Sequence, residues 1–320
     1  MKSKIIVILG PTASGKTEWG IKIAKKFSSI GRPPPEADEP VAQASGWNGA
    51  EIICADSRTV YKYFNIGTAK PAKKERQGVK HHFLDFVDPR KKIYTAADFQ
   101  RGALKIIKEI IERERLPIIV GGSALYIYAL TRGYKFPGKS DTRLRRELES
   151  KTTVELASML KTIRHSSFDN LDLNNRRRII RYLEIAKNSK NKIRHSSAHS
   201  PLPYQFLKIG IDLPRKKVYQ RIDKRTQSWM EEDRLINEVK NLLKKNISKD
   251  RIIEFGLGYR EAIKYLDSEI KNQKELEERI NFCQHNFVRR QMTWFKKDQE
   301  IKWCKNLNNA EKLVIDFLQK

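Results

Sequence analysis

Cysteine is scarce in this chain of 320 residues, and long hydrophobic runs are lacking. The three cysteines, Cys54, Cys283 and Cys304, lie far apart with no histidine at ligand spacing, which excludes a disulfide framework and a zinc site. No apolar run approaches the roughly 20 residues that span a bilayer, and the first, residues 5–9, is too short for a secretion signal. We therefore expect a cytoplasmic protein without a membrane segment.

Acidic residues are few relative to basic ones. The chain has 38 Asp and Glu against 65 Lys and Arg, a net charge of +27. A surface this unbalanced repels itself unless phosphates neutralise it, so the charge favours a nucleic acid as partner. The alternative is a lysine-rich composition that has no such partner.

Repeats, heptads and a glycine period are absent too, which excludes solenoids, coiled coils and collagen.

Strand and helix signals alternate in the first part of the chain. Strands are expected at 4–9, 51–55, 82–87 and 117–120, and helices at 17–27, 95–115 and after 123. A capping box, Thr95 with Asp98, opens the second of these helices. This alternation predicts an α/β fold in which a parallel sheet lies between two layers of helices.

The expected organisation is a core with an insertion. Residues 1–136 form the core, with a polar, proline-rich surface loop at 28–49. Strand signals vanish over 137–203, where charged helical sequence forms an inserted helical domain. Residues 204–320 return to the core with a last strand at 206–212, after which helices are expected to the end of the chain.

Residues 10–17 read Gly-Pro-Thr-Ala-Ser-Gly-Lys-Thr, the G-x-x-x-x-G-K-[ST] pattern, between a predicted strand and a predicted helix. Backbone N–H groups of such a loop surround phosphate oxygens, Lys16 adds a positive charge and the Thr17 hydroxyl can bind Mg²⁺. The pattern predicts a diphosphate site without establishing ATP hydrolysis. The residues expected to line it are Gly10, Pro11, Thr12, Ala13, Ser14, Gly15, Lys16 and Thr17.

Two further polar residues follow strands at the same predicted edge of the sheet. Asp56 ends the second strand and fits three roles: a Mg²⁺ ligand, a general base or an Asx turn. Ser123 follows two glycines after the fourth strand, and its hydroxyl fits a phosphate ligand or a helix N-cap equally well.

An apolar stripe marks the helix predicted after Pro214. Its members are Val218, Ile222, Trp229 and Ile236. Arg225 falls inside this stripe and Arg221 at its edge. An inward-facing arginine needs an anion, since an unpaired buried charge costs several kcal/mol. An internal carboxylate would serve, but the nearby phosphate loop favours a bound phosphate.

Arginines also cluster in the expected insertion. Arg176, Arg177, Arg178 and Arg181 open one helix, and Arg143, Arg145 and Arg146 open another. Guanidinium groups suit phosphates and stacked bases, so these are candidate RNA contacts, with solvated helix faces as the alternative.

With these motifs the chain closely resembles the tRNA dimethylallyltransferases, also called tRNA isopentenyltransferases. The matching blocks are residues 10–17, 55–62, 65–71, 81–89, 94–99, 121–126, 175–184, 202–204, 256–260 and 290–294. They run in family order over nearly the whole chain. One departure is the 28–49 loop, where the family's first helix normally runs almost directly into the second strand.

The resemblance implies a P-loop NTPase-like core with an inserted helical tRNA-binding domain, acting as a monomer. It implies transfer of a dimethylallyl group from dimethylallyl diphosphate to the exocyclic amine of the adenine 3′ of the anticodon, with Mg²⁺ assisting. Asp56 would be the general base. Lys16, Thr17, Ser123 and Arg225 would hold the leaving diphosphate, with Arg221 beside them.

The resemblance also implies contacts with the anticodon stem-loop of tRNA. The residues concerned are Asp56, Ser57, Arg58, Thr59, Arg145, Arg177, Arg178, Ile179, Ile180, Arg181, Phe255, Gly256, Leu257, Gly258, Tyr259 and Arg260. A single-stranded loop suits this chemistry because an adenine leaves its stack there at least cost.

Three other functions compete with this one. A small-molecule kinase would use the same loop with ATP, and an adenylate isopentenyltransferase would prenylate a free nucleotide. A non-catalytic RNA-binding protein would need the basic surface, but not Lys16, Thr17 and Asp56 together.

Overall fold

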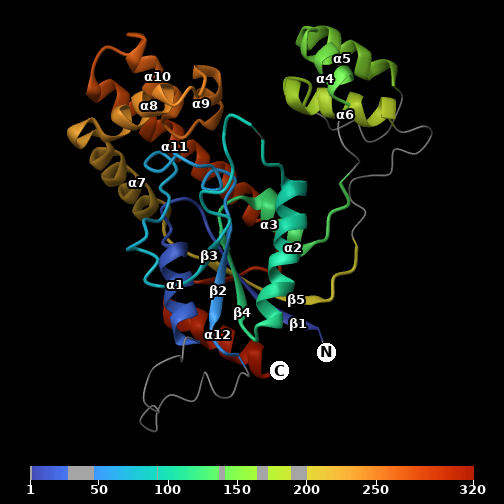
Figure 1. Cartoon of the computed structure of the whole chain (residues 1–320), viewed down its shortest axis with the longest axis vertical. Coiled ribbons are helices and arrows are strands. Elements are labelled where there is room, and N and C mark those ends of the chain that lie inside the picture. The colour runs from blue at the N-terminus through green and yellow to red at the C-terminus, as the bar shows by residue number, and fades with distance from the viewer. Residues whose placement is uncertain (1, 28–46, 92, 137–140, 164–171, 189–199) are drawn as a thin grey trace. The chain divides into compact units, whose positions relative to one another are not determined.

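The computed structural model describes residues 2–27, 47–91, 93–136, 141–163, 172–188 and 200–320 (Figure 1). The chain divides into two compact units: residues 1–131 with 202–320, called the core unit here, and residues 132–201, called the helical unit. Most of the surface loop predicted at 28–49 lies outside the described residues. Among the helices that are described, none is long and apolar enough to cross a membrane.

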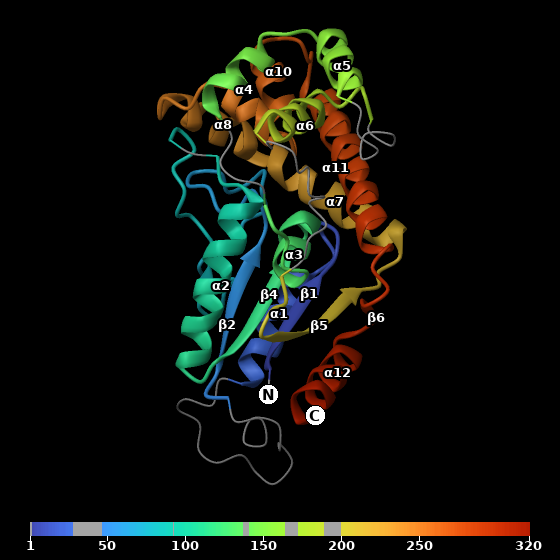
Figure 2. The same cartoon turned by 90° about the vertical axis from the view of Figure 1, so that its right-hand side faces the viewer.

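The core unit is built on six parallel strands in the order β3-β2-β4-β1-β5-β6 (Figures 1 and 2). The strands are β1 (Ser3–Leu9), β2 (Ala50–Ala55), β3 (His81–His82), β4 (Leu116–Gly121), β5 (Tyr204–Ile211) and β6 (Lys302–Cys304). Every residue of β2 and β4 is buried, as is typical of a parallel strand covered on both faces. The predicted α/β fold is confirmed.

Helices cover both faces of this sheet. α1 (Lys16–Lys26) and α12 (Leu307–Gln319) pack against the face that carries Ile6 and Ile8 of β1. Side chains alternate along a strand, so the opposite face meets α2 (Ala96–Glu112) and α3 (Ala124–Thr131) (Figures 1 and 2). The predicted capping box is present at the start of α2: Thr95 and Asp98 each accept the other's backbone N–H.

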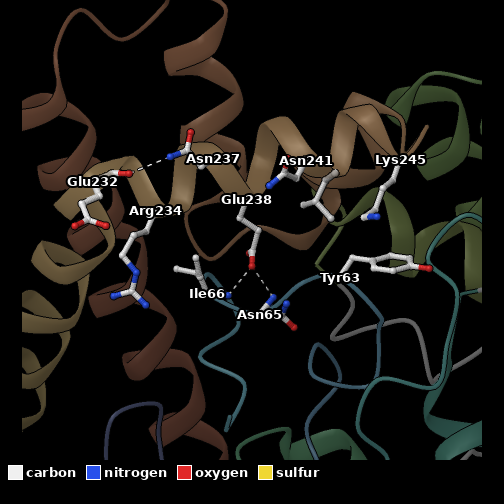
Figure 3. A pocket seen from close by; sticks show the side chains of 10 residues that line it. Tyr63, Asn65, Ile66, Glu232, Arg234, Asn237, Glu238, Asn241 and Lys245 are labelled. Atoms are coloured by element: carbon white, nitrogen blue, oxygen red, sulfur yellow. Dashed lines mark hydrogen bonds between the residues drawn. The ribbon is translucent and has the colours of Figure 1, made fainter. Parts of the chain in front are cut away.

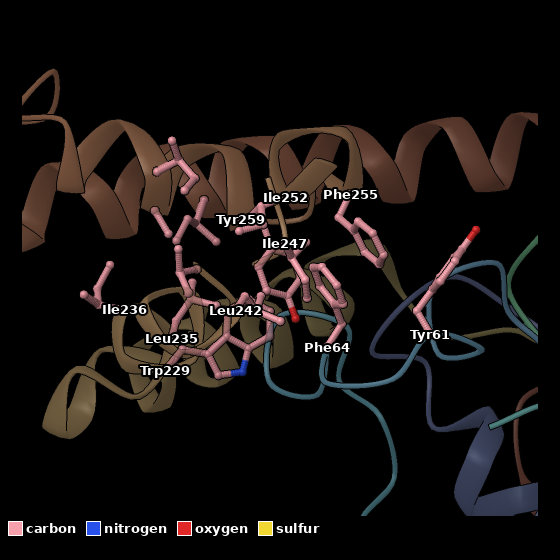
Figure 4. Close-up of a cluster of buried hydrophobic side chains, with 14 of the residues drawn as sticks. Tyr61, Phe64, Trp229, Leu235, Ile236, Leu242, Ile247, Ile252, Phe255 and Tyr259 are labelled. Atoms are coloured by element: carbon pink, nitrogen blue, oxygen red, sulfur yellow. The ribbon is translucent and has the colours of Figure 1, made fainter. Parts of the chain in front are cut away.

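A second hydrophobic cluster lies beyond the carboxyl ends of the strands (Figure 4). Its helices are α7 (Arg215–Met230), α8 (Arg234–Lys244), α9 (Lys249–Phe255), α10 (Tyr259–Leu266) and α11 (Gln273–Phe295). The ring of Phe64 stacks on that of Phe255 with 3.6 Å between centroids and meets Tyr259 edge-on at 5.1 Å. The cluster therefore joins the segment that follows β2 to the C-terminal helices.

The strand predicted at 82–87 is wrong in length. β3 contains only His81 and His82, because Phe83 and Asp85 adopt φ angles of 63° and 54°, which a strand cannot accommodate. The expectation of helices alone after residue 212 is also wrong. β6 pairs in parallel with β5, but its three residues are too few to show a strand pattern in the sequence.

The helix predicted after Pro214 is shorter than its apolar stripe. It ends at Met230, where a short 3₁₀ turn (Glu231–Asp233) follows. Glu232 has a φ of 50°, which breaks the helix, so Ile236 lies on α8 and not with Val218 and Ile222.

The helical unit consists of α4 (Thr142–Glu149), α5 (Thr153–Thr162) and α6 (Arg176–Asn188) in its described part. It has its own hydrophobic cluster, formed by Leu144, Leu148, Leu156, Leu160, Ile179, Ile180 and Leu183.

One buried charge cluster ties β5 to the segment before β6. The Lys208 ammonium lies 3.0 Å from the Asp298 carboxylate and 2.6 Å from that of Glu300, and the side chains of Lys208 and Asp298 are 3% and 2% exposed. We predict that Lys208→Ala lowers the free energy of unfolding by about 3–5 kcal/mol, because Asp298 is left as an uncompensated buried charge. Urea unfolding measures this.

The matched control is Lys22→Ala, which removes an exposed ion pair with Glu18 and should change the unfolding free energy by about 0.5 kcal/mol or less. If Lys208→Ala and Lys22→Ala lowered the free energy of unfolding by the same small amount, the ion pairs of Lys208 would not stabilise this edge of the sheet.

Candidate active site

The polar segments predicted from the sequence meet at the carboxyl edge of the sheet. The 10–17 loop follows β1, Asp56 follows β2 and Ser123 lies just after β4, and these three strands are neighbours. Parallel α/β sheets bind ligands at this edge. Gly121 permits the close approach of β2 and β4, because a Cβ there would lie 2.1 Å from the carbonyl oxygen of Ala55.

The 10–17 loop has the backbone of an anion site. Ala13 and Gly15 adopt φ angles of 60° and 95°, and Gly15 precedes the first residue of α1. The N–H groups of a first helical turn lack intrahelical partners and attract anions. The Ser14 hydroxyl is buried and has no hydrogen-bond partner among the described residues, so it too is available to an incoming oxygen.

Lys16 is a cation with little local compensation. Its ammonium donates to the carbonyl oxygen of Pro11 at 3.1 Å. Burial lowers the pKa of Lys16 to about 8; the nearby Asp56 carboxylate opposes this effect and the Arg225 guanidinium adds to it. An anion bound in the loop would favour the charged form of Lys16.

Arg225 reaches the loop from α7. It donates to the Thr12 hydroxyl at 3.1 Å and to the Gln284 side-chain oxygen, and it lies over the Trp229 ring at 5.2 Å from the centroid. These partners are all neutral, and within the described chain no carboxylate pairs with Arg225. Burial lowers the pKa of Arg225 to about 10, so the group stays charged at neutral pH. Among the described residues, the internal carboxylate that was the alternative partner of Arg225 is not found.

Other side chains fix the shape of the loop. Arg221 donates to the carbonyl oxygen of Ser14 at 3.2 Å. Gln291 of α11 accepts from the backbone N–H of Thr12 at 2.9 Å and donates to the carbonyl oxygen of Gly122 at 2.8 Å. Neither Gln284 nor Gln291 was predicted as a site residue, because their only sequence signal is their polarity on the inward face of α11.

Only one of the two carboxylate oxygens of Asp56 accepts hydrogen bonds from the described residues. Oδ1 accepts from the backbone N–H of Arg58 at 2.8 Å and of Thr59 at 3.3 Å, which makes an Asx turn. Oδ2 receives no hydrogen bond from the described residues and can accept a proton. The Ser123 hydroxyl accepts from the backbone N–H of Ser57 at 2.9 Å, so it fixes the segment after Asp56 instead of capping α3.

The remaining predicted residues of the core unit divide by exposure. Arg260 is exposed, whereas Phe255 and Tyr259 are buried in the second cluster, so their side chains have a packing role. The Arg58 guanidinium lies over the Phe255 ring at 5.3 Å from the centroid. Burial lowers the pKa of Arg58.

In the helical unit, α6 exposes Arg177 and Arg178 and buries the two residues that follow. Ile179 and Ile180 are 0% and 3% exposed, so their side chains pack in the cluster of the helical unit and any contact of these two residues with RNA would come from the backbone.

Two further predicted arginines of this unit form ion pairs within it. Arg145 and Arg181 lie 3.4 Å and 3.2 Å from the buried carboxylate of Glu184. Among the described residues of the whole chain, no group of three or more His, Cys, Asp or Glu side chains could hold a metal ion.

Comparisons with known proteins agree on one family. A family model described as IPP transferase matches residues 59–298. The chain is 35% identical to the tRNA dimethylallyltransferase of Acetivibrio thermocellus over 97% of its length and 95% of that protein, and 38% identical to that of Carboxydothermus hydrogenoformans over 95% and 92%.

Solved structures agree as well. The full-length tRNA isopentenylpyrophosphate transferase of Bacillus halodurans matches with a TM-score of 0.69 and 30% identity, over 99% of this chain and 97% of that one. A eukaryotic dimethylallyltransferase acting on tRNA matches with a TM-score of 0.71 over 98% and 78%; at 23% identity it supports the fold.

The low pKa of Lys16 predicts how anion binding depends on pH. Affinity for inorganic diphosphate should fall as the pH rises above about 8, by up to about tenfold per unit, because only the protonated amine attracts the anion. Calorimetric titration between pH 7 and 9.5 measures this. Lys16→Arg stays charged over that range and should flatten the profile; a slope unchanged in this variant would contradict the assignment.

Proposed function

The chain belongs to the IPP transferase family, and we propose that it transfers a dimethylallyl group from dimethylallyl diphosphate to the exocyclic amine of the adenine 3′ of the anticodon in tRNA. One observation carries this proposal in the structure: a loop with the backbone of an anion site and two buried cations, Lys16 and Arg225, lies beside the carboxylate of Asp56. A site for a departing anion next to a base is what this transfer needs.

The loop and its cations act on the donor. The allylic C–O bond breaks and the diphosphate leaves with both bonding electrons, so negative charge grows on its oxygens. Backbone N–H groups of the loop, Lys16 and Arg225 would stabilise this growing charge. The buried, unpartnered hydroxyl of Ser14 is a further donor toward the same anion.

Magnesium fits this donor set. Mg²⁺ prefers hard oxygen ligands and usually combines one or two protein oxygens with phosphate oxygens and water, so the Thr17 hydroxyl and the diphosphate would hold it. Bound there, it would neutralise part of the charge on the leaving group.

Asp56 acts on the acceptor. The amine nitrogen of adenine forms the new bond to the allylic carbon and gains positive charge as it does so. Transfer of an amine proton to Oδ2 of Asp56 removes that charge, while Oδ1 stays fixed by the N–H groups of Arg58 and Thr59. The Ser123 hydroxyl holds Ser57, which keeps this turn in place.

Basic residues of both units would bind the RNA backbone. In the core unit these are the exposed Arg260 and the half-buried Arg58, which lies between Ser57 and Thr59. In the helical unit they are the exposed Arg177 and Arg178, with Arg145 and Arg181 beside the buried Glu184. Phosphate contacts by arginine supply affinity that weakens with salt. A net charge of +27 strengthens this attraction over the whole chain.

Transfer of label tests the proposal directly. Radiolabelled dimethylallyl diphosphate and Mg²⁺ are incubated with unmodified tRNA, AMP or ATP, and we expect label in tRNA alone. Asp56→Asn should reduce the rate at least about 100-fold, because the amide cannot take the proton, and leave tRNA affinity within about threefold. Asp316→Asn, on the exposed face of α12, is the matched control and should be fully active.

Label in AMP would instead identify an enzyme that acts on free nucleotides. ATP consumption without transfer would identify a kinase. RNA binding with neither reaction would identify a non-catalytic RNA-binding protein.

A further inference from the structure

A buried carboxylate crosses the space between α8 and the loop that follows the Asp56 turn. A slot of about 460 Å³ lies between residues 63–66 and α8, and the side chain of Glu238 spans it (Figure 3). Its Oε2 accepts from the backbone N–H of Asn65 at 3.0 Å and of Ile66 at 2.9 Å. Its Oε1 accepts from the Tyr259 hydroxyl at 2.5 Å. Both oxygens of this carboxylate are therefore engaged.

Tyr259 extends this network to the next two residues of the loop. Burial and the Glu238 carboxylate raise the pKa of Tyr259 well above its ordinary value, so its hydroxyl remains a donor, and the backbone N–H groups of Gly67 and Thr68 partly offset that rise. The ring sits directly on Gly67, where a Cβ would lie 2.6 Å from ring carbons. Four successive backbone N–H groups, residues 65–68, thus face one carboxylate–phenol pair.

The network joins two segments that are distant in sequence. One runs from Asp56 through the loop at 65–68, and the other is 255–260, which contains Tyr259 itself. Phe64 stacked on Phe255 makes a second link between the same two segments. Both segments carry proposed RNA contacts, whereas the groups that face the diphosphate, Lys16 and Arg225, lie on other elements and share no bond with Glu238.

We propose that Glu238, acting through Tyr259 and the 65–68 backbone, is a positioning residue that sets the affinity for tRNA without affecting the affinity for the prenyl diphosphate. The inference rests on the proposed function, since the two segments are taken to contact RNA. Glu238 itself touches no substrate. It holds the two RNA-binding segments at a fixed separation, so that both can reach the anticodon loop at once.

Glu238→Gln tests this role with little change in volume. An amide presents an NH₂ group where the carboxylate accepted hydrogen bonds, so either the loop N–H groups or the Tyr259 hydroxyl loses its partner. We expect the KM for tRNA to rise at least about tenfold, with kcat within about threefold and the KM for dimethylallyl diphosphate within about twofold of wild type. Steady-state kinetics below the melting temperature of each variant give these values.

A double-mutant cycle separates positioning from general damage. Tyr259→Phe should raise the KM for tRNA in the same direction, and the double variant Glu238→Gln/Tyr259→Phe should be no worse than the worse single variant, because both break one network. Additive effects would overturn the proposed coupling.

Glu51→Gln is the matched control. Glu51 is a buried carboxylate at the start of β2, bonded to His82 at 2.6 Å and to Arg113 at 2.9 Å, at the opposite end of the strand from Asp56. The Glu51→Gln variant should have a lower melting temperature, with the KM for tRNA and the KM for dimethylallyl diphosphate each within about twofold of wild type.

Two outcomes would overturn the positioning role. A KM for tRNA that stays within twofold in Glu238→Gln would show that the network does not govern RNA binding. Equal losses for tRNA and for the diphosphate donor would show that Glu238 merely stabilises the fold. Failure of the proposed function is distinguishable from both, because wild-type protein would then transfer no label to tRNA.

Discussion

Buried positive charge at the carboxyl edge of the sheet, more than the nearby carboxylate balances, is the constraint on which the rest of the structure depends. Lys16 and Arg225 are partly or fully removed from water, yet Arg225 has only neutral partners and Lys16 has the Asp56 carboxylate as its one nearby opposing charge. Such an arrangement costs free energy in the empty protein and is repaid when an anion enters. Burial lowers the pKa of both Lys16 and Arg225.

Different side chains hold the diphosphate side and the acceptor side of the site. The diphosphate side is braced by α7 and α11, through Arg225, Gln284 and Gln291. The acceptor side is braced by the second hydrophobic cluster, where Glu238 and Tyr259 hold the segment that continues from Asp56. The two sets of hydrogen bonds have no residue in common, although α7 and α11 also pack in the second cluster.

The sequence predicted what depends on local pattern. The place of the 10–17 loop between a strand and a helix, the buried parallel strands and the Thr95–Asp98 capping box each rest on residues close together in the chain, and each is confirmed. The position of Asp56 at the end of its strand could be predicted from the sequence. The division of labour between its two carboxylate oxygens could not, because it depends on which backbone N–H groups Oδ1 meets in the folded chain.

Features set by tertiary packing were not predictable in the same way. Glu238 lies on an amphipathic helix where a single acidic residue normally indicates a solvent-facing position, and its partners are 21 and 173 residues away. Ile179 and Ile180 belong to a block matched to the family, but only the packing of the helical unit shows that they are buried. β3 is cut short by left-handed residues whose conformation no strand pattern reveals.

The most direct test of the account is a crystal structure with the anticodon stem-loop and a dimethylallyl diphosphate analogue whose bridging oxygen is replaced by sulfur. The account predicts the diphosphate in the 10–17 loop against Lys16 and Arg225, and the adenine amine within about 3 Å of Oδ2 of Asp56 and about 3.5 Å of the allylic carbon. An analogue bound outside the loop, or an adenine that turns its amine away from Asp56, would contradict it.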